Sequence, residues 1–164
     1  MKKNSKQKWI GALTVLVALG LSIDALSGTA RAADSAAQAS LHALTSAPPP
    51  TLFGIFNPNH QYLQNGTSVA TVSEGSISAT GSTTAKVRVD SVGITFYLQR
   101  WTGTDWVTVG SGQTTSGSNT NVHSSNFSRS TVAGYYYRIK TVHWVNHDGV
   151  YEDGEKYTGS LLAY

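Results

Sequence analysis

The sequence predicts an all-β protein, an antiparallel β-sandwich, on three observations made from residue 60 onward. The composition is rich in Thr, Ser, Val, Tyr and Gly, and β-branched and aromatic residues favour strands. Apolar and polar residues alternate with a period of two, as they do in strands that bury one face. Turn residues interrupt this alternation at short intervals, which is typical of a sandwich of short strands.

The first 32 residues are typical of a secretory signal peptide. Four lysines open the chain, an apolar run extends from Trp9 to about Leu21, and small residues surround Arg31. A basic end, an apolar middle and small residues before the cut are the three parts of such a peptide. The apolar run is short for a membrane span. We therefore expect cleavage near Ala32 and a secreted, extracellular protein that does not span a membrane afterwards.

Removal of this leader changes the charge of the chain. The intact sequence carries a formal charge of +3, but residues 33–164 contain seven bases and eight acids, a net charge of −1. Nucleic-acid binding requires a dense basic stripe, so no nucleic-acid partner is expected. The sequence has no cysteine, and the fold must therefore be stabilised by its core without disulfides.

Residues 33–59 form a separate segment rich in Ala, Ser and Pro. Pro48, Pro49 and Pro50 favour an extended polyproline conformation. An apolar patch follows at residues 52–56, before Asn57-Pro58-Asn59. We expect a flexible segment with a small hydrophobic anchor docked on the domain of residues 60–164. A removable pro-segment and a partner-binding arm are the alternatives.

The strands follow from the alternation and the turns between them. Strands are expected at residues 67–72, 76–79, 85–89, 93–101, 106–110, 122–128 and 135–145, with one or two more between 150 and 161. Turns are expected at 65–66, 74–75, 102–105, 116–119 and 147–149. Trp101 and Trp106 flank one hairpin, and residues 146–149 form the turn of another. Residues 85–89 are either a strand or a turn between two others.

The alternation also assigns faces. Ile94, Phe96 and Leu98 lie on one side of their strand, and Tyr137 and Ile139 lie on one side of theirs. If the two strands are neighbours, their opposite sides form one mixed aromatic, amide and cationic face. Its members are Tyr97, Gln99, Trp101, Tyr136, Arg138, Lys140 and Trp144. Flat rings among hydrogen-bond donors suit sugars, so this face predicts glycan binding. Ordinary stabilisation of an exposed sheet by cross-strand aromatic and cationic pairs is the alternative.

Metal binding has two candidate clusters. His143 and His147 have metal-like spacing, but they would stand roughly 13 Å apart on a strand. They also lack the glutamate of the zinc-protease motif. The acids near the last hairpin could provide oxygen ligands for calcium, or they could form a solvated edge that prevents aggregation. These acids are Asp148, Glu152, Asp153 and Glu155. We expect no metal and no other cofactor.

Catalytic motifs do not stand out. The sequence has neither a Gly-x-Ser-x-Gly elbow nor a cysteine nucleophile. Glu74, Asp90, Asp105 and Glu152 could pair as glycosidase carboxylates only at a suitable separation. A non-enzymatic protein is therefore expected.

Two stretches carry a resemblance to a known group. Residues 93–109 read Gly-Ile-Thr-Phe-Tyr-Leu-Gln-Arg-Trp-Thr-Gly-Thr-Asp-Trp-Val-Thr-Val, and residues 134–143 read Gly-Tyr-Tyr-Tyr-Arg-Ile-Lys-Thr-Val-His. They resemble small secreted proteins of Gram-positive, Bacillus-like bacteria that carry a β-sandwich domain of unknown function. The resemblance covers roughly residues 76–160. It implies an immunoglobulin- or fibronectin-like sandwich and brings no established activity and no site residues.

These observations predict a secreted, non-enzymatic binding protein. A polysaccharide or cell-wall surface is the expected ligand, bound by the aromatic face. The alternative is an extracellular protein partner, for an inhibitor, a toxin-like effector or a matrix component that uses the apolar patch at residues 52–56.

Overall fold

The computed structural model describes residues 42–50, 53–54 and 56–164, and the predicted leader lies outside the described residues. The described chain is all-β, with seven antiparallel strands and no helix among the described residues. The strands are β1 (Leu63–Ser73), β2 (Ser76–Trp101), β3 (Trp106–Thr108), β4 (Gln113–Ser130), β5 (Tyr136–His147), β6 (Val150–Tyr157) and β7 (Leu161–Leu162). Within these residues, therefore, no helix has the length and hydropathy to cross a membrane.

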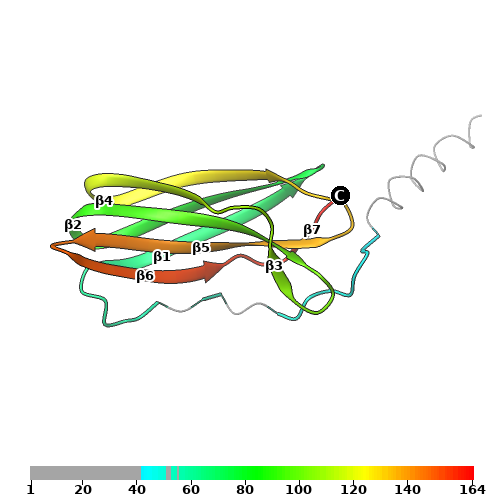
Figure 1. The fold of residues 1–164 in the computed structure, drawn as a ribbon, viewed down its shortest axis with the longest axis horizontal. Helices are drawn as coiled ribbons and strands as arrows, with labels where there is room; N and C mark the ends of the chain where they lie inside the picture. Colours follow the sequence, from blue (N-terminus) through cyan, green and yellow to red (C-terminus); the bar gives the residue numbers. More distant parts are fainter. Residues whose placement is uncertain (1–41, 51–52, 55) are drawn as a thin grey trace, which may run out of the picture.

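The 26-residue strand β2 organises the sheet. The long strand β4 pairs with it along one edge. On the other edge, β1 pairs with the first part of β2, and β5 pairs with the second part. Strand β6 follows β5 in the sheet, β3 pairs with the end of β2, and β7 pairs with the start of β5. Strand β2 therefore pairs with β4 along one edge, and with β1 and then β5 along the other (Figure 1).

The sheet curls at the middle of β2. Its pairing with β4 shifts register between Thr84 and Val89, in the region expected as a strand or a turn. Beyond the shift, the two parts of β2 contribute to one core, in which Ile77 packs with Ile94 and Phe96. The rings of Phe96 and Phe127 stack with 5.5 Å between centroids. The first and second parts of β2 therefore face each other across the interior.

Two predicted boundaries are wrong. The strands expected at 76–79, 85–89 and 93–101 are one continuous strand, and the turn expected at 116–119 lies within β4. Gly117 pairs with Val92 and Ser118 with Ser91, and only Asn119 has a positive φ, 52°. A polar, glycine-containing stretch continues as a strand here because β2 supplies a paired backbone along it.

The two hairpin turns are confirmed. Trp101 and Trp106 are register partners at the base of the first hairpin. In the second, Asp148 and Gly149 have φ values of 50° and 76°. Two consecutive positive φ values characterise the two-residue turns that match strand twist.

The turn expected at Asn65-Gly66 is also wrong. Both residues lie within β1, where Gly66 pairs with Thr83. A Cβ at Gly66 would lie 2.3 Å from the ring of His143. This glycine therefore permits close approach of a buried side chain and does not reverse the chain.

The segment before β1 packs against β6. The Glu152 carboxylate of β6 accepts hydrogen bonds from the backbone N–H groups of Gln61, Tyr62 (2.8 Å) and Leu63 (2.7 Å). Phe56 packs on Gly154 and lies 5.8 Å from the His143 ring. The described part of the predicted flexible segment therefore contacts the sheet at Phe56 and at the backbone of Phe53, whose carbonyl oxygen accepts a 3.4 Å hydrogen bond from the Tyr157 N–H. The Phe53 side chain is 68% exposed. Leu52 and Ile55 lie outside the described residues.

Candidate functional site

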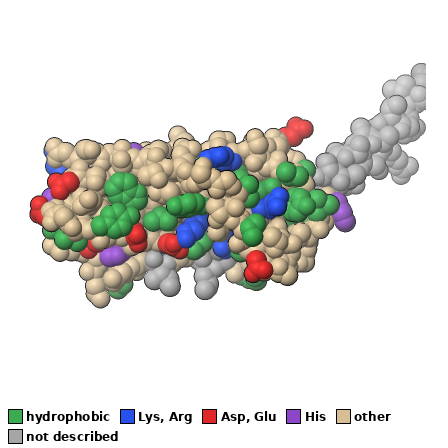
Figure 2. All heavy atoms as spheres, viewed as in Figure 1, with side chains coloured by type: hydrophobic (Ala, Val, Ile, Leu, Met, Phe, Trp, Pro, Cys, Tyr) green, Lys and Arg blue, Asp and Glu red, His purple; other side chains and the backbone are tan. Residues whose placement is uncertain are grey.

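The two strands that carry the predicted face are direct neighbours. Tyr97 pairs with Lys140, Gln99 with Arg138, and Gly93 with Trp144. Inward residues such as Ile94 are fully buried, and outward residues are half-buried. We call the outward side of β3, β5, β6 and the second part of β2 the outer face. Figure 2 shows hydrophobic side chains in patches on this face, with Lys and Arg side chains among them.

We call three rings on the outer face the aromatic platform, namely Tyr97, Trp144 and Tyr151. Trp144 and Tyr151 are in contact, and Tyr97 lies four residues after Gly93, the register partner of Trp144. The Trp144 ring lies against Gly93, where a Cβ would come within 2.3 Å of it. The Tyr97 ring lies in the same way over Gly112, at 2.6 Å from a Cβ there. Tyr151 stacks beside Trp144 with 6.1 Å between centroids and is 57% exposed. The absence of a side chain at each glycine lets the rings lie close to the sheet.

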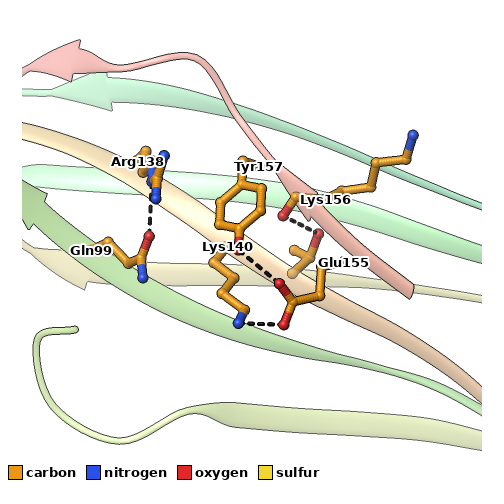
Figure 3. A network of polar contacts seen from close by, with 7 residues as sticks. Gln99, Arg138, Lys140, Glu155, Lys156 and Tyr157 are labelled. Atoms are coloured by element: carbon orange, nitrogen blue, oxygen red, sulfur yellow. Dashed lines mark hydrogen bonds and ion pairs between the residues drawn. The ribbon is translucent and has the colours of Figure 1, made fainter. Parts of the chain in front are cut away.

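Arg138 occupies a second position on the outer face. Its guanidinium lies 4.4 Å from the ring centroid of Trp106 and 4.5 Å from that of Tyr157. Its Nε donates a hydrogen bond of 2.8 Å to Oε1 of Gln99 (Figure 3). Burial lowers the pKa of Arg138, with partial compensation from Tyr157. Two aromatic rings and one amide therefore hold this cation in a fixed orientation.

Lys140 is neutralised within the protein. It forms an ion pair with Glu155, which also accepts a 2.7 Å hydrogen bond from the Tyr157 hydroxyl. Burial opposes ionisation of Glu155, but the hydrogen bonds from Lys140 and Tyr157 outweigh it and lower the pKa of this carboxyl. Burial likewise disfavours charged Lys140, yet Glu155 and Tyr157 raise its pKa overall. Both groups are therefore charged near neutral pH.

Trp101 is the predicted site residue that the structure does not bring to the surface. Its strand parity matches that of Tyr97 and Gln99, but the side chain is buried. The side chain is 6% exposed and packs 5.4 Å from Trp106. Tyr136 lies at the start of β5, paired with Leu162. External rings for stacking are therefore Tyr97, Trp144 and Tyr151 rather than Trp101.

The two histidines considered for a metal site have different surroundings. His143 is fully buried, with its Nδ1 2.8 Å from the Thr83 hydroxyl and its Nε2 2.9 Å from the Thr141 hydroxyl. Burial, with the nearby charge of Lys156, lowers its pKa to about 4. His147 lies in the hairpin beside Asp90, 3.4 Å from a carboxylate oxygen. The two side chains therefore do not form a common ligand set.

The acids considered for calcium also lie in different surroundings. Glu152 is bonded to the backbone before β1, and Glu155 is paired with Lys140 on the outer face. Asp148 instead approaches His147 and Asp90, whose possible ligand atoms lie within 4.8 Å of one another. The four acids of the predicted cluster are therefore not brought together.

Three outer-face aromatic residues were not in the predicted site: Trp106, Tyr151 and Tyr157. The period-two alternation of residues 150–157 would have placed Tyr151 and Tyr157 on one side of β6. The hairpin turn expected at residues 146–149 also places this strand beside β5, so the sequence contained the signal for both residues.

Comparisons with protein-family models, curated proteins and solved structures find no match for this chain.

Proposed function

We propose that this protein is a secreted, non-enzymatic binding protein that holds a polysaccharide or cell-wall surface on its outer face. The observation that carries the proposal is the aromatic platform, in which Tyr97 and Trp144 lie on glycines and Tyr151 is 57% exposed. The C–H-rich face of a pyranose packs on the electron-rich face of an aromatic ring. Polar groups on the same face, Gln99 and Arg138, would bind sugar hydroxyls.

Export and the finer fold type belong to the same proposal. The basic and apolar composition of residues 1–32 supports a cleaved signal peptide. The contribution of both parts of β2 to one core supports a sandwich of the immunoglobulin- or fibronectin-like type. A protein exported in this way would meet cell-wall glycans outside the cell.

Retention on insoluble polymers tests the proposal. Purified residues 33–164 are incubated with peptidoglycan or cellulose, and the protein in pellet and supernatant is measured. We expect selective pelleting that is lost in Trp144→Ala. Tyr164→Ala, at an exposed ring of 41%, is the matched control and should pellet like the wild type. Equal pelleting of all three proteins would exclude the platform as the site.

A second candidate function is protein binding through the segment before β1. Phe53 is 68% exposed and lines a hollow of about 320 Å³ beside Ser68, Ala70 and Leu161. An exposed aromatic ring at such a hollow is a common anchor for a protein partner. Pull-down of an extracellular protein by residues 33–164 that is lost in Phe53→Ala, while pelleting on the polymers is unchanged, would favour this candidate.

A further inference from the structure

Arg138 has a fixed position but, in the part of the chain that the structure describes, no anionic partner. The ion pairs among the described residues involve Lys140 and His147, and none involves Arg138. The nearest acid along the network, Glu155, is already bonded to Lys140 and Tyr157. A half-buried cation usually has a compensating negative charge, and this one has only rings and an amide.

The contacts of Arg138 leave one edge of its guanidinium free. Trp106 and Tyr157 lie against the guanidinium, and Gln99 accepts from Nε. Among the described residues, the two Nη atoms have no hydrogen-bond partner in the protein. Neither Nη atom is among the buried atoms that lack a partner, so solvent reaches this edge. The free edge of a planar guanidinium matches the two oxygens of a carboxylate or phosphate.

We propose that the glycan held by the outer face is acidic, and that Arg138 binds its carboxylate or phosphate through the two Nη atoms. The inference rests on the proposed function and names the ligand class. The stacked rings and Gln99 hold the guanidinium in place, so little side-chain entropy is lost when the anion binds. Lys140, neutralised by Glu155, does not provide a second equivalent site.

The spacing along β5 adds that the ligand is an oligomer. Arg138 and Trp144 lie six residues apart on one strand, which corresponds to roughly 20 Å. A single sugar cannot reach both positions. A chain of several sugars can stack on the platform and present an acidic group to Arg138.

A ligand series with and without charge tests the inference. The probes are polygalacturonate for carboxylate, wall teichoic acid for phosphate and fully methyl-esterified galacturonan as the neutral counterpart of the first. We expect at least one acidic polymer to bind roughly tenfold more tightly than the neutral one, because hydrogen bonds to an anion are charge-assisted and stronger than those to a neutral group. The acidic polymer that binds more tightly identifies the source of the anion.

Variants assign the effect to Arg138. Arg138→Gln should remove the preference for the acidic polymer, and Arg138→Lys should weaken it because the two-pronged geometry is lost. Arg88→Gln removes one exposed cation elsewhere on β2 and should leave binding unchanged. Thermal unfolding of each variant checks that the fold is retained.

The outcomes separate this inference from the proposed function. Binding of neutral and acidic polymers with equal affinity, lost in Trp144→Ala but retained in Arg138→Gln, would overturn the acidic ligand alone. An equal loss in Arg138→Gln and Arg88→Gln would also overturn it, because net charge and not the site would then decide binding. No binding of any probe, neutral or acidic, would overturn both proposals.

Discussion

His143 lies in the interior between two threonine hydroxyls. Thr83 also lies 3.0 Å from the carbonyl oxygen of Gly93 and donates to it. The Thr83 oxygen is then free to accept from Nδ1–H of His143, and Thr141 can donate to Nε2. Both ring nitrogens of a neutral imidazole are therefore satisfied in the interior. Burial and the nearby positive charge of Lys156 both disfavour the charged ring.

Stability should therefore fall as the pH falls through the range between the two pKa values of His143. The ordinary value is 6.5 and the folded value is about 4, so below pH 6.5 the unfolded chain binds a proton that the folded chain does not. We expect the free energy of unfolding to fall by about 2 kcal/mol from pH 7 to pH 5. Urea unfolding at both pH values measures it.

The loss of stability due to His143 occurs at a higher pH than the loss due to the carboxylates. The pKa values of Glu152 and Glu155 are lowered in the fold, so their contribution is present above the ordinary value of 4.5 and is lost as the pH falls below it. His143→Gln should therefore flatten the profile between pH 7 and 5. A wild-type profile that is already flat over this range would show that His143 is not held neutral.

Gly66 provides a steric prediction at the same site. Gly66→Ala places a Cβ 2.3 Å from the His143 ring, and we expect it to destabilise the protein by roughly 2 kcal/mol. The same change should cost less in a His143→Ala background, since the clashing ring is gone. Gly159→Ala, with no atom within 4 Å of the new Cβ, is the control. Equal effects at Gly66 and Gly159 would contradict the packing account.

At the scale of elements, the sequence predicted what depends on local chemistry. The Trp101–Trp106 hairpin and the Asp148-Gly149 turn were predicted because turn residues stand between alternating strands. The neighbouring strands that carry Tyr97 and Lys140 were a conditional expectation, and their direct pairing confirms it.

The remainder depended on tertiary contacts. Strand β2 is continuous, and β4 continues through Gly117, because the two long strands pair with each other. Local sequence patterns do not predict this pairing. Gly66 gave the same sequence signal as a turn, although its role is to admit His143. Trp101 has outward parity but is buried and packs against Trp106. Alternation along a strand predicts which side of the sheet each side chain faces, whereas the burial of that side chain depends on the segments that pack against it.

The segment before β1 is expected to stabilise the sheet through Phe56. Phe56 packs against the core cluster of Leu63 and Val145 and lies under Lys156, so Phe56→Ala should lower the free energy of unfolding by about 2 kcal/mol. Phe53→Ala, at a ring that is 68% exposed, should change it by less than about 0.5 kcal/mol. Chemical denaturation compares them. A neutral Phe56→Ala would show that the segment merely rests on the sheet.

At the scale of the whole molecule, the curled sheet presents two chemically different outward sides. On the side formed by β1, the first part of β2 and the second part of β4, short hydroxyl and amide side chains pair across strands. Ser78 pairs with Ser128 at 3.1 Å and Thr80 with Asn126 at 3.1 Å. The outer face instead carries the aromatic platform and Arg138. The chain thus concentrates its large rings and its oriented cation on one side.

Retention on peptidoglycan is the measurement that tests this division most directly. It compares the pelleted fraction of wild-type residues 33–164 with that of a Tyr97→Ala/Trp144→Ala variant and of Thr80→Ala on the opposite side. We predict that the double variant stays in the supernatant while Thr80→Ala pellets like the wild type. Full retention of a folded double variant would contradict glycan binding by the outer face.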